Sequence, residues 1–115
     1  MPQKEIFVSV IIPTFNRYLL LEKTINSFIK QEFDQNFEII ISDNNSTDRT
    51  EDLIKNKIKP TSKVPIIYHK EQQQGVHFAR NSASKLARGE ILYFTDDDME
   101  ADKLLLAELT KIFKN

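Results

Sequence analysis

Four short apolar runs along the chain have the composition of buried β-strands. They are rich in the β-branched and aromatic residues that favour strands, and they cover residues 8–12, 37–41, 64–69 and 91–95. Pro13 is expected to end the first run, because proline cannot donate a hydrogen bond to a neighbouring strand. Pro65 weakens the third run, which we therefore expect near a sheet edge.

Apolar residues recur at helical spacing after each of these runs. Asp48 and Glu51 have the spacing of a capping box at the start of the second helix. Gly89 is suited to the C′ position after the third helix. The predicted apolar faces of the four helices are Leu21, Ile25, Phe28 and Ile29; Leu53, Ile54 and Ile58; Ala79, Ala83, Leu86 and Ala87; and Leu105, Leu109, Ile112 and Phe113.

Strands that alternate with helices predict an α/β fold, a Rossmann-like and mostly parallel sheet flanked by helices. Nearly continuous apolar strands fit a sheet that is covered on both faces. Since parallel strands end at one edge of the sheet, the polar segments 13–17, 42–45 and 96–98 are expected to converge there. Ligands bind at that edge in open α/β sheets.

Composition narrows the functional classes. The chain has 115 residues, enough for one domain, and its net charge of −1 gives no basic surface for a nucleic acid. It has no cysteine, which excludes disulfides, thiolate zinc sites and cysteine nucleophiles. His69 and His77 lack the spacing of a zinc site. Without a signal-peptide core or an apolar stretch of transmembrane length, we expect a cytoplasmic protein.

Three consecutive carboxylates, Asp96, Asp97 and Asp98, follow the last apolar run. Like charges in one place need water, a cation or cationic side chains, and hard divalent cations prefer carboxylate oxygens. If the backbone stays extended, Asp96 and Asp98 face one side and Asp97 the other. An isolated acidic triplet is also compatible with a solvated loop or a helix N-terminus. Its place beside two other polar segments favours a metal site.

Four motifs in sequence order carry a resemblance to a known family. They are VSVIIPTFNR at 8–17, ISDNNSTDRT at 41–50, GVHFARN at 75–81 and FTDDD at 94–98. Together they resemble family 2 of the inverting glycosyltransferases, which use nucleotide-diphosphate sugars and have the GT-A fold. The resemblance covers essentially the whole chain, and it implies a UDP-linked donor and Mn²⁺ or Mg²⁺ as cofactor.

The resemblance also implies roles for individual residues. Asp43 would accept the imide N–H of a uracil ring, although an Asx-turn is the alternative for a loop aspartate. Arg80 would lie near the nucleotide, where its fork could bind a carbonyl or a carboxylate such as Asp43. Asn16 is expected to cap the first helix, and Arg17 either reaches phosphate or lies at the surface. The nucleotide-binding positions implied are Pro13, Thr14, Phe15, Asp43, Arg80, Asp96 and Asp97, and the metal positions are Asp96 and Asp98.

An inverting transfer needs a general base for the acceptor hydroxyl, and the family supplies it well beyond the metal motif. No candidate base follows Asp98, so we assign no catalytic residue. We expect residues 1–115 to be the N-terminal, nucleotide-sugar-binding part of a glycosyltransferase domain, without its acceptor-binding part. Such a fragment would be inactive alone. In the full-length protein it could be peripheral at the inner membrane face. Its incomplete sheet would favour self-association through an exposed edge.

Other classes of protein fit less well. A phosphoacceptor receiver domain needs paired acids after its first strand, where residues 13–16 read Pro-Thr-Phe-Asn. A P-loop or dinucleotide fingerprint cannot be built from Gly75 and Gly89, the two glycines of the chain. A non-catalytic nucleotide-sugar-binding or interaction module remains the alternative to a transferase.

Overall fold

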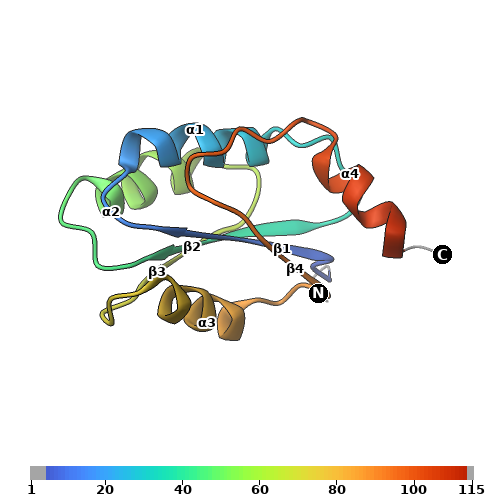
Figure 1. The fold of residues 1–115 in the computed structure, drawn as a ribbon. Helices are drawn as coiled ribbons and strands as arrows, with labels where there is room; N and C mark the ends of the chain where they lie inside the picture. The colour runs from blue at the N-terminus through green and yellow to red at the C-terminus, as the bar shows by residue number, and fades with distance from the viewer. Residues whose placement is uncertain (1–4, 114–115) are drawn as a thin grey trace.

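Four parallel strands form one sheet in the order β3-β2-β1-β4 (Figure 1). The structure, a computed structural model, describes residues 5–113. The strands are β1 (Val8–Thr14), β2 (Phe37–Asp43), β3 (Ile66–Lys70) and β4 (Ile91–Phe94). β1 pairs with β2 and β4, and β2 pairs with β3, all in parallel. The predicted α/β fold with a parallel sheet is confirmed, and β3 lies at an edge as expected.

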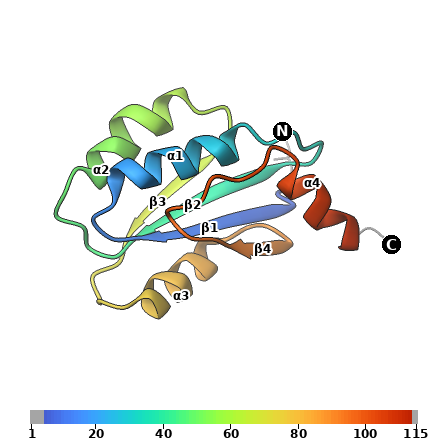
Figure 2. The same cartoon turned by 45° about the horizontal axis from the view of Figure 1, so that its top comes forward.

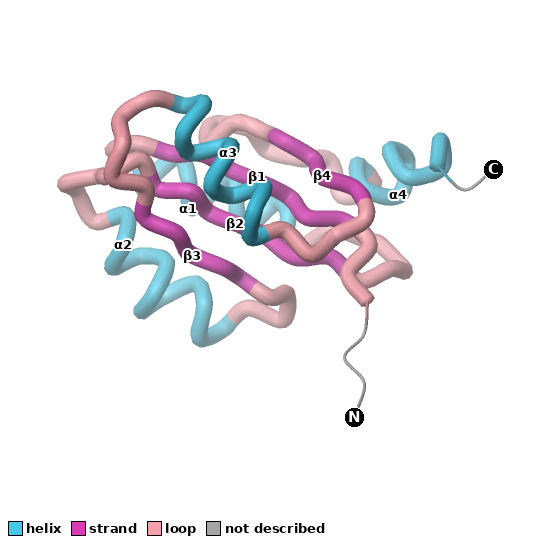
Figure 3. Tube along the Cα trace, turned by 90° about the horizontal axis from the view of Figure 1, so that it is seen from below, coloured by secondary structure: helices cyan, strands magenta, loops and turns pink. Residues whose placement is uncertain are grey.

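Helices lie on both faces of the sheet. The first face is covered by α1 (Tyr18–Ile29) and a helical segment that continues from α2 (Thr50–Asp52) through the π-helical turn η1 (Leu53–Ile58) into the 3₁₀ turn η2 (Lys59–Thr61) (Figure 2). On the opposite face, α3 (Val76–Leu86) packs against β1 and β2, and β4 lies to one side of it (Figure 3).

The last elements are α4 (Leu105–Thr110) and the 3₁₀ turn η3 (Lys111–Phe113). They lie toward the end of the sheet where β1 begins (Figure 1). No helix of residues 5–113 is long and apolar enough to cross a bilayer.

Strand alternation divides the core into two unequal parts. Along each strand, every second side chain faces α1 and the α2 segment, as Val10 and Ile39 do. These side chains form the main core together with the fully buried Leu21, Ile25 and Phe28. The alternate side chains face α3, where Ile11 and Ile40 form a smaller cluster with Ala83. Burial on both faces explains why β1 and β2 are apolar without alternation.

The first strand does not end at Pro13 but continues to Thr14. The carbonyl of Ile11 accepts a hydrogen bond from Thr95 on the β4 side. Pro13 lies two residues after Ile11, so its nitrogen points toward the same side. At that level β4 has already ended, at Phe94. The hydrogen bond that proline cannot donate is therefore not needed there.

The last strand is not the buried strand that its composition predicts. β4 ends at Phe94, one residue before the predicted end, and its exposed fractions are 38% for Leu92 and 42% for Phe94. β4 lies at the sheet edge and outside α3, so one of its faces is uncovered. An apolar run of this length does not reveal whether a helix will cover it.

Two predicted helix faces are also partly wrong. In the final helix the buried residues are Leu106 and Thr110, whereas Ile112 and Phe113 are exposed. Ala79 and Ala83 of α3 are buried as predicted, but Leu86 is exposed, and Ala87 follows the end of the helix and is only partly buried.

Gly89 and Glu51 have roles other than the predicted ones. α3 ends at Leu86, and a Cβ on Gly89 would lie 2.6 Å from the backbone nitrogen of Ser9, so glycine is required by close approach to β1. Asp48 accepts a hydrogen bond from the Thr50 nitrogen at 3.0 Å, but Glu51 pairs with a lysine instead of completing a capping box.

Candidate functional site

The three predicted polar segments do converge at the carboxyl ends of the strands. The backbone nitrogen of Asn44 donates a hydrogen bond to the carbonyl of Thr14 at 2.8 Å, which joins the segments after β2 and β1. The Thr14 hydroxyl donates to Oδ2 of Asp97 at 2.9 Å, which joins the segments after β1 and β4. The strand order reverses between β1 and β4, so this is the topological switch point at which α/β sheets bind ligands.

The acidic segment has one buried and two exposed carboxylates. Asp97 is 7% exposed, and Oδ1 of its carboxylate lies 3.2 Å from Nη1 of Arg17. Asp96 and Asp98 are exposed. The backbone turns at Asp97 and Asp98, so the extended conformation does not persist through the triplet. The turn is held from α1 by Thr24, whose hydroxyl donates to the Asp97 carbonyl at 2.9 Å.

A cavity of about 270 Å³ opens at this convergence. Its wall brings together most of the positions predicted to bind nucleotide, and leaves out Asp43, Arg80 and the predicted metal position Asp98. Asn44, Val76 and Ala79 complete the wall without having been predicted there, together with Arg17, for which contact with phosphate was one of two expectations. The lining residues are Pro13, Thr14, Phe15, Arg17, Asn44, Val76, Ala79, Asp96 and Asp97.

Asp43 is fully buried at the end of β2. Its Oδ1 accepts the backbone nitrogen of Ser46 at 2.9 Å, a local contact three residues along the loop and so one residue longer than the Asx-turn alternative, and its Oδ2 accepts the Tyr68 hydroxyl at 2.5 Å. Burial, reinforced by this hydrogen bond, raises the pKa of Tyr68 above its ordinary value of 10.0. Nothing in the sequence around Tyr68 indicates this partnership, because an aromatic residue in a strand is common.

The predicted contact between Arg80 and Asp43 is not made. Arg80 is exposed on α3, and its guanidinium has no hydrogen-bond or ion-pair partner among residues 5–113. A side chain on the first turns of α3 does not reach a carboxylate that is already enclosed by Ser46 and Tyr68.

Asn16 does not cap α1, because Arg17 occupies the N-cap position. Asn16 instead has a left-handed φ of 51° and accepts hydrogen bonds from the backbone nitrogens of Thr47 and Asp48 at 2.8 and 3.2 Å. It therefore ties the loop after β1 to the loop after β2. Asp48 is the residue that reaches α1, through the nitrogen of Tyr18 at 3.4 Å.

Asn44 fixes the loop that leads into α3. Its side-chain nitrogen donates to the Gln73 carbonyl at 2.6 Å, and its Oδ1 accepts the Gly75 nitrogen at 2.8 Å. Next to this loop, Ser82 on α3 donates a hydrogen bond to Glu71 and holds the pKa of that carboxyl below its usual value. These contacts position the start of α3 beside the cavity.

The exposed carboxylate oxygens at this site fit a divalent cation that takes its other ligands from a bound molecule. No cluster of three or more histidine, aspartate or glutamate side chains in the described part of the chain is arranged to hold a metal. Asp96 and Asp98 offer exposed carboxylate oxygens, whereas Asp97 is engaged by Thr14 and Arg17. Magnesium-type sites commonly use one or two carboxylates and take their remaining ligands from phosphates and water.

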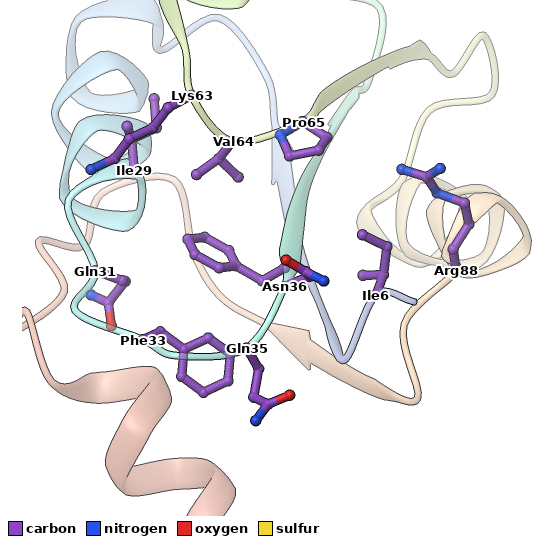
Figure 4. A pocket seen from close by; sticks show the side chains of 11 residues that line it. Ile6, Ile29, Gln31, Phe33, Gln35, Asn36, Lys63, Val64, Pro65 and Arg88 are labelled. Atoms are coloured by element: carbon purple, nitrogen blue, oxygen red, sulfur yellow. The ribbon is translucent and has the colours of Figure 1, made fainter. Parts of the chain in front are cut away.

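A larger cavity of about 520 Å³ lies at the opposite end of the strands (Figure 4). Its wall is mixed, with apolar residues such as Ile6, Phe33 and Val64 beside polar ones such as Gln35 and Asn36. Arg88 lies at one side, and its Nε is engaged at 2.9 Å by the buried carboxylate of Glu38. This cavity lies away from the carboxyl ends of the strands, so we do not assign it as the nucleotide site.

Comparison with known proteins gives a family match over almost all of the chain. The model of Glycosyl transferase family 2 matches residues 9–115. GalNAc(5)-diNAcBac-PP-undecaprenol beta-1,3-glucosyltransferase of Campylobacter jejuni is 38% identical over 93% of this chain and 33% of its own length. Validoxylamine A glucosyltransferase of Streptomyces hygroscopicus is 32% identical over 77% of this chain and 21% of its own length.

Solved structures share the same fold. S. aureus TarS 1–349 in complex with UDP-GlcNAc superposes with a TM-score of 0.81 at 28% identity, covering 94% of this chain and 31% of TarS 1–349. Mannosyltransferase PcManGT of Pyrobaculum calidifontis, in complex with GDP-Man and Mn²⁺, has a TM-score of 0.87 at 26% identity and coverages of 96% and 33%. The chain thus spans about a third or less of these proteins.

Proposed function

Because the chain belongs to glycosyl transferase family 2, we propose that it binds the nucleotide-diphosphate sugar donor of a metal-dependent, inverting sugar transfer. We propose a UDP-linked hexose as the donor and Mn²⁺ or Mg²⁺ as the cation. Family membership favours this transferase function over a non-catalytic binding module.

One observation carries the proposal: the ends of β1, β2 and β4 meet in a single cavity at the switch point of the sheet. Thr14 and Phe15 contribute a hydroxyl and an apolar ring, Asn44 an amide, and Asp96 a free carboxylate. A sugar nucleotide needs this mixture, because its base is flat and partly apolar and its diphosphate is charged.

Asp43, which is fully buried at the end of β2 and lies outside the cavity wall, is proposed to read the base once the side chains that cover it move aside. Each of its carboxylate oxygens accepts one hydrogen bond in the structure. Since a carboxylate offers about four lone-pair positions, acceptor capacity remains for the imide N–H of uracil. Arg80, exposed and without a partner among the described residues, is proposed to reach a phosphate or a base carbonyl.

The proposed metal residues are Asp96 and Asp98. When bound, the cation would neutralise the diphosphate and stabilise it as the leaving group. The role of this chain is to hold the two exposed carboxylates at the end of β4 while Thr14 and Arg17 fix the turn between them through Asp97.

The reaction also needs a base for the acceptor hydroxyl. We propose that residues 1–115 form the donor-binding part, and that the base and the acceptor-binding part belong to the rest of a longer domain. The length of the relatives supports this, because the chain spans about a third of each of two of them. The chain alone is then expected to transfer no sugar. Robust transfer to any of a panel of acceptors would show that a carboxylate such as Glu100 or Asp102 serves as base.

The binding proposal is tested by calorimetry of UDP and UDP-glucose, with Mn²⁺ and with a chelator. We expect binding only with the metal, and loss of this metal dependence in Asp98→Ala. Asp97→Ala should retain more of the metal dependence, because Asp97 is turned toward Thr14 and Arg17. Equal affinity with and without chelator would contradict the metal role, and tighter binding of GDP than UDP would contradict the choice of base.

A further inference from the structure

The guanidinium of Arg17 lies between two carboxylates of the acidic triplet. A single nitrogen, Nη1, is 3.2 Å from Oδ1 of Asp97 and 3.6 Å from Oδ2 of Asp98. Among residues 5–113, Arg17 is the cationic side chain that pairs with this segment. It therefore neutralises part of the charge of three adjacent carboxylates.

The two contacts of Arg17 differ in strength. The Asp97 side chain is only 10% exposed and is also held by Thr14, so its pairing with Arg17 is sheltered from solvent. The Asp98 side chain is 52% exposed and lies beyond ordinary hydrogen-bond distance. An exposed ion pair of this kind is screened by water and salt and is easily broken.

The backbone of Arg17 is fixed although its side chain is half exposed. Its carbonyl accepts the Leu21 nitrogen at 2.9 Å at the start of α1. The preceding residue, Asn16, is tied to the loop after β2 through two backbone nitrogens. A change of partner therefore requires rotation of the Arg17 side chain only, with no movement of the loop.

From this geometry we infer that Arg17 competes with the divalent cation for Asp98 and then donates hydrogen bonds to the diphosphate of the sugar donor. Without a cation, Arg17 bridges Asp97 and Asp98. When Asp98 becomes a metal ligand, Arg17 keeps Asp97 and turns its freed N–H groups into the cavity that it lines. The inference rests on the proposed function, because it needs a metal and a diphosphate at this site.

The competition has a thermodynamic consequence. Displacing Arg17 from Asp98 weakens the binding of the cation alone, whereas a diphosphate that accepts the freed N–H groups recovers part of this loss. Arg17 thus makes cation and nucleotide bind cooperatively, and linkage requires each to strengthen the other by the same factor. Arg17 would therefore disfavour binding of the cation in the absence of the sugar-nucleotide donor.

The test is the affinity for Mn²⁺, measured from free Mn²⁺ by electron paramagnetic resonance, with and without UDP. Arg17→Gln should bind Mn²⁺ without UDP about two- to fivefold more tightly than the unchanged protein, the effect expected of one exposed ion pair. The factor by which UDP strengthens Mn²⁺ binding should fall. Arg49→Gln is the matched control, because Arg49 is exposed at the start of α2 and makes the same change of charge.

Arg17→Lys, which keeps the charge, should stay closer to the unchanged protein in both measurements. It provides a second test of the same position if the glutamine variant misfolds. If Arg17→Gln binds Mn²⁺ no more tightly than Arg49→Gln while the unchanged protein binds UDP with metal, the inference about Arg17 is overturned and the proposed function stands. If the unchanged protein binds neither Mn²⁺ nor UDP, the proposed function fails and the inference fails with it.

Discussion

The hydroxyl of Thr14 donates a 2.9 Å hydrogen bond to the carboxylate of Asp97, a residue 83 positions further along the chain. Thr14 ends β1 and Asp97 follows β4, and the two strands are neighbours in the sheet. Both side chains are buried. This contact divides the acidic triplet into a central structural member and two outer carboxylates that remain exposed.

The first prediction concerns this division. Asp97→Ala should lower the free energy of unfolding by about 1–3 kcal/mol, because it leaves the buried Thr14 hydroxyl without its acceptor and Arg17 without its sheltered partner. Asp96→Ala, at an exposed neighbour, should change it by less than about 0.5 kcal/mol. Urea denaturation of both variants measures the difference, and equal losses would contradict it.

The second prediction concerns base recognition. Asp43→Ala should weaken UDP binding about ten- to hundredfold, because a hydrogen bond to a charged group is lost. Mn²⁺ binding should be largely unchanged, since Asp43 does not line the cavity with Asp96. Tyr68→Phe is the control, because it removes a partner of Asp43 but keeps the carboxylate. Unchanged UDP affinity in the folded Asp43 variant would reject base recognition by this residue.

The third prediction concerns alkaline pH. The pKa of Tyr68 is raised in the folded state by burial and by the Asp43 carboxylate, so above the ordinary value of 10.0 the unfolded chain loses this proton more readily than the folded one. The contribution of Tyr68 to stability is therefore complete below 10.0 and is lost as pH rises toward the folded pKa. The unchanged protein should lose more stability than Tyr68→Phe over this range in urea denaturation. Parallel pH profiles would show that Tyr68 ionises normally.

The fourth prediction concerns Gly89. A Cβ at this position would lie 2.6 Å from the Ser9 nitrogen, 2.7 Å from the Ser9 hydroxyl and 2.8 Å from the Val8 carbonyl carbon. Gly89→Ala should therefore destabilise the fold by about 1–3 kcal/mol through overpacking. Adding Ser9→Ala should not restore stability, because two of the three crowded atoms belong to the backbone. Full rescue by the second change would show that β1 and the segment before β4 separate easily.

The fifth prediction concerns the open edge of the sheet. β4 has no partner on its outer side within the described residues, and Leu92 and Phe94 are exposed on it. An apolar strand edge of this kind favours pairing with another chain. Sedimentation should detect self-association that increases with protein concentration and is reduced in Phe94→Lys. Leu19→Lys on α1, where Leu19 is 64% exposed, is the matched control and should leave the association unchanged.

Local patterns in the amino-acid sequence are enough to predict the order of the elements and the edge of the sheet at which the polar segments meet. Apolar runs and helical periodicity are local signals, and parallel strands must end on the same side. The positions Pro13, Thr14, Phe15, Asp96 and Asp97 were therefore correctly expected to come together, and they line one cavity. The family motifs added the class of ligand, and the family match supports it.

Which members of each local pattern are buried, and what they contact, depends on how the elements pack in the folded protein. The run that forms β4 has the composition of an interior strand, yet it lies at the edge with one face uncovered. Asp97 rather than its neighbours is enclosed, because Thr14 and Arg17 approach from the end of β1. Tyr68 reaches Asp43 across the β2–β3 pair. These contacts join residues far apart in the sequence, and they depend on strand order and on helix placement, which no local pattern contains.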